Sequence, residues 1–294
     1  MKAEYITPAV TLFKEDGKPD FDSLKKLYNH LIDGGISGIL VLGSIGEFFA
    51  VSKEDKKEII RFAVDQIKGR VKILVGTNSM IPGETIELSN FALECGADGV
   101  VIIPPYYFTL TDDSIYDFYA EIANEVKGDI YIYNFPDRTG YDISPEVMLR
   151  LARKFSNIVG CKDTIPGVAH TREIIKMVKS EFPDFKVYSG FDDNFAYNVI
   201  SGGNGCIGGL SNVIPGFFKE WMDAFEENDL QKISEKQQEV NRLMDIYGVG
   251  VPFVPYIKTA MAALGIIDSD KATFPLPKAT KEDVEKLLGI LERR

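Results

Sequence analysis

Two short apolar segments of the sequence end in side chains that could carry out Schiff-base chemistry. Residues 130–136 and 158–164 each begin as an apolar run typical of a strand and finish in polar residues. Since side chains alternate along a strand, Tyr133 and Lys162 fall at the polar ends of these segments. A lysine amine can attack a ketone, and a tyrosine hydroxyl can transfer protons. A lysine that ends an apolar strand more often simply reaches water, so this hypothesis depends on what lies nearby.

The composition predicts a folded protein that acts on small molecules or on other proteins. The chain has 294 residues, of which 45% are hydrophobic, which suffices for a large core and excludes disorder as a description of the whole. Its formal net charge of -11 repels nucleic acid and anionic membranes, so we expect neither as a partner. An anionic substrate is still allowed, because groups inside a pocket outweigh a distant net charge that salt screens.

The cysteines and histidines argue against disulfides and against a metal site. Three scattered cysteines, Cys95, Cys161 and Cys206, lie in or beside apolar runs, as expected of buried thiols in a reducing compartment. The two histidines, His30 and His170, have no partner at metal-ligand spacing, and we expect His170 to be a capping or surface residue. The N-terminal residues lack the apolar core of a signal peptide, and no apolar run could span a bilayer, so the sequence predicts a cytoplasmic protein.

A pattern of helix, glycine turn and buried strand recurs about every 30 residues along the chain. Strands are predicted at residues 7–13, 38–43, 71–77, 100–103, 130–133, 158–162, 186–189 and 205–208. Helices are predicted between them, the first over residues 21–31 and the second from a Ser52 cap through Gln66. Eight such units predict a (β/α)8 TIM barrel rather than an open doubly wound sheet, since no Gly-x-Gly-x-x-Gly run followed by a strand-end acid supports dinucleotide binding.

The barrel is predicted to occupy residues 1–226, and residues 227–294 are predicted to form a C-terminal helical extension. Three further helical patterns, at residues 229–244, 252–264 and 281–294, follow the eighth unit. No linker or low-complexity stretch separates them from the barrel. We therefore expect a single domain in which the extension packs on the barrel.

In a (β/α)8 barrel the chemistry lies at the C-terminal ends of the strands, and the polar residues of this sequence gather there. Those ends hold Gly43–Glu47, Thr77, Pro105–Tyr107, Tyr133–Asn134, Lys162–Thr164, Gly190–Asp193 and Gly208–Gly209. A lysine, several tyrosines and small hydroxyls at one mouth strengthen the catalytic interpretation of Lys162. The Gly43–Glu47 turn could hold a carboxylate with its backbone N–H groups, although a plain βα turn would also use these glycines. Tyr106 and Tyr107 could equally be packing aromatics at a subunit contact.

Four motifs follow one another along the chain. They are Gly-Ser-Ile-Gly-Glu at residues 43–47, Pro-Pro-Tyr-Tyr at 104–107, Tyr-Asn-Phe-Pro at 133–136 and Gly-Cys-Lys-Asp-Thr at 160–164. This set resembles the pyruvate-dependent class I aldolases, a family that includes dihydrodipicolinate synthase, N-acetylneuraminate lyase and 2-keto-3-deoxy-sugar-acid aldolases. The resemblance runs over nearly the whole chain and is specific, because the lysine and the tyrosine stand at the expected strand ends.

The resemblance implies a role for each residue at the mouth. Lys162 would form a Schiff base with a 2-oxo acid, Tyr133 would shuttle protons, and Tyr107 would approach the site across the interface of a homodimer or homotetramer. The pyruvate carboxylate would bind the turn at Gly43, Ser44, Ile45 and Gly46. Further substrate contacts are expected from Arg138, Thr164, Gly190, Asp192 and Ile207. Neither a metal nor an organic cofactor would be needed, because the lysine itself forms the covalent intermediate.

Individual residues point to different members of this family. Dihydrodipicolinate synthases usually carry two adjacent threonines in the turn, and the second position here is Ile45, which cannot hydrogen-bond. Arg138 argues the other way, since it matches the synthase position that receives the carboxylate of aspartate semialdehyde. Residues 189–193 resemble the lyase and sugar-acid aldolase form, in which the acidic residue, here Asp192, meets substrate hydroxyls. Residues 162–170 look most like bacterial 2-keto-3-deoxygluconate-type aldolases.

The leading hypothesis is therefore a lyase that cleaves a 2-keto-3-deoxy sugar acid to pyruvate and an aldehyde. The first alternative is dihydrodipicolinate synthase, which condenses pyruvate with aspartate semialdehyde. Behind it come N-acetylneuraminate lyase, a Schiff-base dehydratase of deoxy sugar acids, and a catalytically silent barrel that binds pyruvate or a sugar acid. The presence of both Lys162 and Tyr133 argues against the silent barrel.

Overall fold

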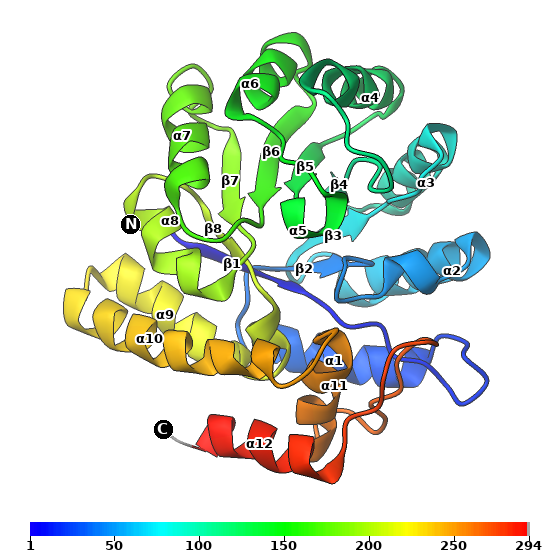
Figure 1. Ribbon diagram of the computed structural model, residues 1–294, viewed down its shortest axis with the longest axis vertical. Coiled ribbons are helices and arrows are strands. Elements are labelled where there is room, and N and C mark those ends of the chain that lie inside the picture. Colours follow the sequence, from blue (N-terminus) through cyan, green and yellow to red (C-terminus); the bar gives the residue numbers. More distant parts are fainter. Residues whose placement is uncertain (293–294) are drawn as a thin grey trace.

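The chain forms a closed barrel of eight parallel strands, as predicted (Figure 1). The computed structural model describes residues 1–292. The strands pair in chain order and β8 closes on β1; they are β1 (Glu4–Pro8), β2 (Gly38–Val41), β3 (Lys72–Gly76), β4 (Gly99–Ile102), β5 (Ile130–Asn134), β6 (Ile158–Asp163), β7 (Lys186–Ser189) and β8 (Gly205–Ile207). Runs such as Gly-Ile-Leu-Val in β2 are buried throughout, because a parallel barrel strand is covered on both faces.

The first strand lies earlier in the chain than the sequence predicts. The apolar pattern places it at residues 7–13, whereas β1 spans Glu4–Pro8 and pairs with β2 and β8 along that stretch. Residues 10–13 are just as buried, but they run past the ends of both neighbouring strands. Phe13 instead forms an isolated antiparallel bridge with Pro19. The apolar pattern therefore misplaced the strand. It indicates which residues are buried, but it does not show where the neighbouring strands end.

Helices surround the barrel and alternate with its strands (Figure 1). They are α1 (Phe21–Asp33), α2 (Lys53–Ile67), α3 (Pro82–Cys95), α4 (Asp112–Glu125), α6 (Pro145–Lys154), α7 (Ala169–Val178), α8 (Phe195–Ile200) and α9 (Pro215–Glu227), with a short α5 (Pro136–Thr139) after β5. The predicted stripe of α1 is buried at Leu24, Leu27 and Leu31. Ser52 caps α2 as predicted, since its side chain accepts a hydrogen bond from the Asp55 N–H.

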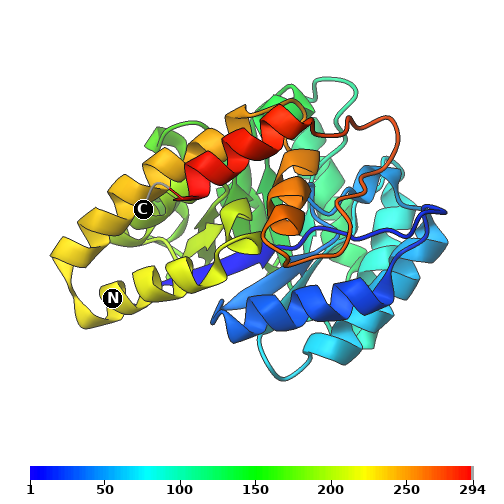
Figure 2. The same cartoon turned by 90° about the horizontal axis from the view of Figure 1, so that it is seen from below.

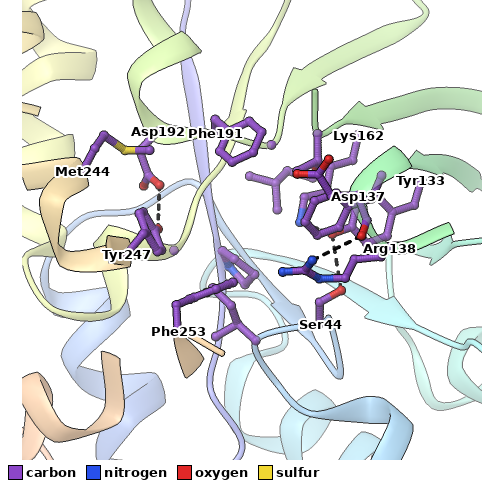
Figure 3. A pocket seen from close by; sticks show the side chains of 17 residues that line it. Ser44, Tyr133, Asp137, Arg138, Lys162, Phe191, Asp192, Met244, Tyr247 and Phe253 are labelled. Atoms are coloured by element: carbon purple, nitrogen blue, oxygen red, sulfur yellow. Dashed lines mark hydrogen bonds between the residues drawn. The ribbon is translucent and has the colours of Figure 1, made fainter. Parts of the chain in front are cut away.

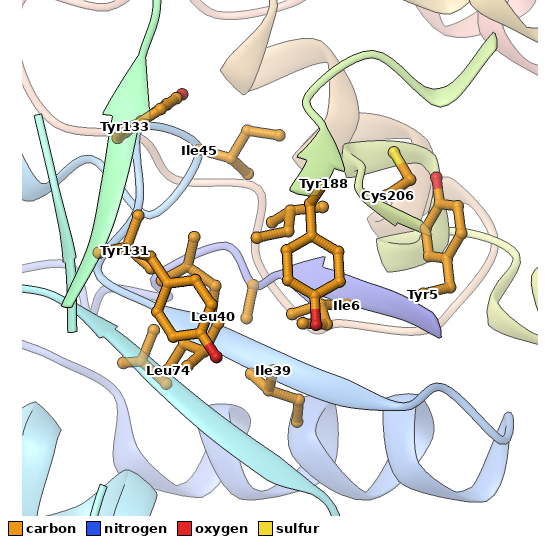
Figure 4. Close-up of a cluster of buried hydrophobic side chains, with 14 of the residues drawn as sticks. Tyr5, Ile6, Ile39, Leu40, Ile45, Leu74, Tyr131, Tyr133, Tyr188 and Cys206 are labelled. Atoms are coloured by element: carbon orange, nitrogen blue, oxygen red, sulfur yellow. The ribbon is translucent and has the colours of Figure 1, made fainter. Parts of the chain in front are cut away.

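Large side chains fill the interior of the barrel below its mouth (Figure 4). Tyr131 and Tyr188 lie there with aliphatic residues such as Leu74, and both tyrosines are nearly inaccessible to solvent. Gly160 on β6 makes room for one of them, because a Cβ at that position would lie 2.8 Å from the Tyr131 ring. The interior is therefore a packed core, and the open space is left to the end of the barrel that carries Tyr133 and Lys162.

The C-terminal extension consists of α10 (Leu230–Leu243), the 3-10 helix η4 (Met244–Gly248), α11 (Val254–Ala263) and α12 (Lys281–Glu292). All three predicted helices are present, although the last two residues predicted for the third lie outside the described residues. Figure 2 shows α12 beside α10 and α11, on the flank of the barrel. We propose that residues 1–226 and 227–294 form one domain, because side chains of the extension reach into the barrel mouth.

A buried ion pair attaches the extension to the turn that follows β2. Lys258 of α11 donates to Glu47, and both side chains are wholly inaccessible to solvent. The Lys258 amine also donates to the Lys271 carbonyl at 2.9 Å, while Glu47 accepts hydrogen bonds of 2.7 Å from the N–H and hydroxyl of Thr273. Burial lowers the pKa of Lys258, and the charge of Glu47 opposes that shift. Each ion therefore has partners that compensate its loss of water.

Replacing Lys258 by Met should lower the free energy of unfolding by about 3–5 kcal/mol, because Glu47 would be left as a buried charge without its counter-ion. Urea denaturation of the purified variant measures this. Lys26→Met is the matched control, since the Lys26–Asp268 pair also joins the barrel to the extension but is largely exposed, so little change is expected. The double variant Glu47→Gln/Lys258→Met should recover part of the loss. Wild-type stability of Lys258→Met would contradict this account.

Candidate active site

The structure brings Tyr133 and Lys162 together at the barrel mouth (Figure 3). They stand on the neighbouring strands β5 and β6 and are paired in the strand register. The Lys162 Nζ lies 3.3 Å from the Tyr133 hydroxyl oxygen and 4.4 Å from the centre of its ring. Both side chains are buried. An amine nucleophile and a proton carrier thus face each other in a site that excludes most water.

The turn after β2 brings a second hydroxyl, that of Ser44, to this pair. Ser44 Oγ lies 3.4 Å from the Tyr133 hydroxyl oxygen, so the three side chains form a chain of polar groups. Leu42, just before the turn, and Glu47, its last residue, have φ angles of 57° and 56°, a left-handed conformation that costs a non-glycine residue about 1–3 kcal/mol. The Glu47–Lys258 ion pair holds one end of this strained turn. The Thr11 hydroxyl donates to the Gly46 carbonyl at 2.6 Å and holds it from the barrel side.

A cavity of about 160 Å³ opens beside Lys162. It is lined by nine residues that the sequence places in the site: Ser44, Ile45, Tyr133, Arg138, Lys162, Thr164, Gly190, Asp192 and Ile207. Gly43 and Gly46 belong to the same turn but do not line the cavity. Ile45 packs its side chain over Gly209 and presents only hydrocarbon to the space.

Thr164 and Gly190 fit each other closely at the wall of the cavity. The Thr164 hydroxyl is buried and has no hydrogen-bond partner within the described residues. Gly190 must be glycine there, since a Cβ would lie 1.8 Å from that hydroxyl oxygen. A buried hydroxyl without a partner is costly, so a polar ligand group is the natural partner for Thr164.

Arg138 stands at the mouth, and its guanidinium forms no salt bridge with a carboxylate of the described residues. Its guanidinium carbon lies 5.0 Å from the centre of the Phe135 ring, and its side chain donates a hydrogen bond of 3.3 Å to the Asp137 carbonyl. The aromatic ring supports the cation without neutralising it. Arg138 can therefore bind an anionic or hydroxylated group of a substrate.

Asp192 lines the cavity, but its carboxylate is already bound by protein groups (Figure 3). One oxygen accepts from the Tyr5 hydroxyl and, at 3.0 Å, from the Leu210 N–H; the other accepts from Tyr247 at 2.7 Å. Burial raises the pKa of Asp192, while these hydrogen bonds oppose the shift. With 1% of its surface exposed, Asp192 is better suited to supporting the wall than to the substrate contact expected from the sequence.

Tyr107 lies outside the cavity of its own chain. It belongs to the loop between β4 and α4 and is 80% exposed, and the neighbouring Phe108 is 75% exposed. Further apolar side chains, Phe49 and Ile81, are exposed in the segments that join β2 to α2 and β3 to α3. The expected catalytic role of Tyr107 thus needs a neighbouring subunit.

The expectation for His170 is wrong. The N-cap of α7 is Val168, and His170 is mostly buried with its Nδ1 3.0 Å from Asp163.

The sequence also did not reveal Met244, Tyr247 and Phe253 of the extension, which form part of the cavity wall. No spacing pattern could have found them, because they meet the barrel mouth only through the tertiary fold. Among the described residues there is no group of three or more potential metal ligands, and no helix long and apolar enough to cross a bilayer.

Comparison with known proteins identifies a family that shares this fold. The family model described as "Dihydrodipicolinate synthetase family" matches residues 1–294. The putative 2-dehydro-3-deoxy-D-gluconate aldolase YagE of Escherichia coli K12 is 37% identical over 278 residues, which is 95% of this chain and 91% of that protein. A 4-hydroxy-tetrahydrodipicolinate synthase of Kosmotoga olearia is 40% identical over 276 residues, 94% of this chain and 92% of that protein.

Solved structures show the same likeness. The crystal structure of YagE in complex with pyruvate has a TM-score of 0.95 at 35% identity and covers 98% of this chain and 97% of its own. A structure described as the first monomeric dihydrodipicolinate synthase variant has a TM-score of 0.92 at 30% identity, with 98% and 95% covered. The resemblance seen in the motifs is thereby confirmed. The chain belongs to the dihydrodipicolinate synthetase family of pyruvate-dependent class I lyases.

Proposed function

We propose that this chain is an aldolase that cleaves a 2-keto-3-deoxy sugar acid to pyruvate and an aldehyde through a Schiff base on Lys162. The observation that carries the proposal is the 3.3 Å separation of the Lys162 amine from the Tyr133 hydroxyl inside a buried cavity. The names of two relatives support the substrate class: YagE, and the probable 2-dehydro-3-deoxy-D-pentonate aldolase YjhH, which is 35% identical over 290 residues.

The geometry provides a group for each step of the cleavage. The Lys162 amine attacks the C2 ketone, water leaves, and a protonated imine forms. This iminium withdraws electrons from C3, so the C3–C4 bond breaks as Tyr133 takes the proton of the C4 hydroxyl and the aldehyde departs. The resulting enamine gains a proton at C3, and hydrolysis releases pyruvate and the free lysine. Neither a metal nor an organic cofactor takes part, because the iminium itself accepts the electrons.

The remaining wall residues divide between the two ends of the substrate. Ser44, with the backbone of Gly43, Ile45 and Gly46, would hold the carboxylate, and the unpartnered Thr164 hydroxyl would donate to the same end. Gly190 and Ile207 would shape the space around them. Arg138 would meet the distal end, where a sugar acid carries hydroxyls and an acidic sugar a second carboxylate.

The second candidate is 4-hydroxy-tetrahydrodipicolinate synthase, which condenses pyruvate with aspartate semialdehyde. The Arg138 guanidinium favours it, since this cation at the cavity could receive the carboxylate of the semialdehyde. Several relatives carry the name of this enzyme, among them the one from Kosmotoga olearia. Ile45 argues against it, because its hydrocarbon side chain stands where the synthase motif has a relay hydroxyl.

We also propose that the enzyme acts as a homodimer or homotetramer in the cytoplasm. One solved relative is described as the first monomeric synthase variant, which implies that oligomers are usual among these synthases. The exposed Tyr107 and Phe108 offer an apolar contact for a second copy. An apolar cavity beside Ser44, lined by Phe48, Phe49 and Tyr106 among others, could receive an aromatic side chain from that copy. All three cysteines are free, as expected in a reducing compartment.

Release of pyruvate from a small substrate panel tests the proposed reaction. The panel contains 2-keto-3-deoxygluconate, its galactonate epimer, the corresponding pentonates and N-acetylneuraminate, and a parallel assay follows pyruvate consumption with aspartate semialdehyde. We expect release from at least one deoxy sugar acid and no reaction with the semialdehyde. Activity with the semialdehyde alone would replace the proposal by the synthase function. Consumption of a deoxy sugar acid without pyruvate release would indicate a dehydratase.

Substitution of the reacting residues tests the mechanism. Lys162→Ala should abolish turnover and the covalent adduct that borohydride traps with pyruvate, since no other lysine of residues 1–292 lines the cavity. Tyr133→Phe should reduce kcat by about a hundredfold or more, because it removes a positioned proton carrier. Tyr28→Phe is a matched control: this tyrosine of α1 is buried and does not line the cavity, so kcat should stay near the wild-type value. Full activity of Lys162→Ala would refute the mechanism.

A further inference from the structure

A second set of polar side chains lies directly behind the catalytic pair, on the outer face of the barrel. Asn134 follows Tyr133 on β5, Asp163 follows Lys162 on β6, and the two are paired in the strand register. Because side chains alternate, they point away from the cavity toward the surrounding helices. The Asn134 amide donates to the Asp163 carboxylate at 2.9 Å, and both side chains are buried. This bond joins the two strands one residue beyond the reacting groups.

Helix α7 and the segment before α6 complete this set. The Thr171 hydroxyl donates to Asp163 at 2.5 Å, and His170 Nδ1 lies 3.0 Å from the same carboxylate. On its other side, His170 Nε2 lies 3.2 Å from the Ile143 carbonyl and 3.2 Å from the Asp142 carboxylate. Asn134 also donates to Asp142, at 2.6 Å. We call Asn134, Asp142, Asp163, His170 and Thr171 the Asp163 cluster.

The surroundings of His170 favour its protonated form. Within the described residues, both ring nitrogens face acceptors, and a neutral imidazole has only one N–H to offer. The charged groups that face the ring are Asp163 on β6 and Asp142 on the segment between α5 and α6. Burial by itself lowers the pKa of His170, but the hydrogen bond and charge of Asp163, with the charge of Asp142, outweigh it and raise the pKa above 6.5.

We propose that the Asp163 cluster positions Lys162 against Tyr133, and that the imidazolium of His170 makes this positioning sensitive to pH. None of the five residues lines the cavity, so they act through the strands and not on the substrate. The inference rests on the proposed aldolase function, because that function makes the separation of the two groups matter. A displacement of about 1 Å at a reacting group can cost about a hundredfold in rate.

The direction of the pH effect follows from the raised pKa. The bonds of the imidazolium are fully present below the ordinary histidine value of 6.5 and are lost as the pH rises through the higher value of the folded protein. Loss of the proton leaves one ring nitrogen facing an acceptor without a hydrogen, so the tie between α7, β6 and the 142–143 segment weakens. The catalytic rate should therefore fall on the alkaline side.

Two histidines in the chain make the test direct. His170→Asn keeps a donor near Asp163 but cannot ionise, and His30→Asn is the control, since His30 bonds to the Asn212 carbonyl and does not line the cavity. We expect wild type and His30→Asn to share an alkaline fall in kcat. His170→Asn should lose that fall and have kcat about tenfold to a hundredfold lower near neutral pH, with KM changed less than about threefold. NMR titration of the imidazole, assigned with His30→Asn, should place the pKa of His170 above 6.5.

A second pair of variants covers the case in which His170→Asn fails to fold. Thr171→Val removes one donor to Asp163 without changing shape and should lower kcat, whereas Thr171→Ser should restore it. If the cluster had only a structural role, Thr171→Val would lower thermal stability but leave kcat and its pH profile as in the wild type. That result would overturn the inference. Borohydride trapping of pyruvate distinguishes failure of the proposed function from failure of the positioning role. If the wild type forms no adduct, the proposed function is refuted. If wild type and His170→Asn are trapped at equal rates at every pH, only the positioning role is refuted.

Discussion

The eight strands close on themselves, so every strand is hydrogen-bonded on both sides and none can slip without breaking two ladders. This closure holds Tyr133 level with Lys162, because β5 and β6 are locked between β4 and β7 as well as to each other. The packed interior beneath them prevents inward collapse of the mouth. A reacting pair 3.3 Å apart is therefore a property of the whole barrel and not of two adjacent strands alone.

The turn after β2 depends on a different kind of restraint. Leu42 and Glu47 adopt left-handed backbone angles, which side chains of this size avoid in unconstrained chains. The ion pair to Lys258 and the hydrogen bonds from Thr273 hold Glu47 in place. The conformation of the proposed carboxylate-binding turn thus relies on residues more than 200 positions further along the chain. A barrel cut off before α10 would lose this support.

The barrel and its reacting pair could be predicted from the sequence because both leave local signals. Apolar runs bounded by glycines mark the strands, and Lys162 and Tyr133 stand at the ends of two of them. The position of β1 could not be predicted as well, since burial extends beyond the end of its pairing partners. The extension residues of the cavity wall, such as Tyr247, left no signal, because their role arises from a contact between distant parts of the chain.

The roles of two polar residues, Asp192 and His170, could not be predicted from their spacing in the sequence. Asp192 lies at the expected strand end, but whether its carboxylate faces a substrate depends on Tyr5 and Tyr247, which approach from β1 and η4. His170 follows Lys162 closely in sequence, and only the folded chain shows that Asp142 and Asp163 enclose it. In both cases the type of residue was informative, and its partners could only be found in three dimensions.

Two parts of the chain, the barrel and the C-terminal extension, form the cavity wall. This division affects how substrate preference can change during evolution. Lys162, Tyr133 and Ser44 come from the barrel, whereas Met244, Tyr247 and Phe253 come from the extension. Changes in the extension can reshape the far side of the cavity while the groups proposed to handle pyruvate stay in place. Descendants of this protein could thus acquire new aldehyde substrates through substitutions in the extension alone, while the residues that break the bond stay unchanged.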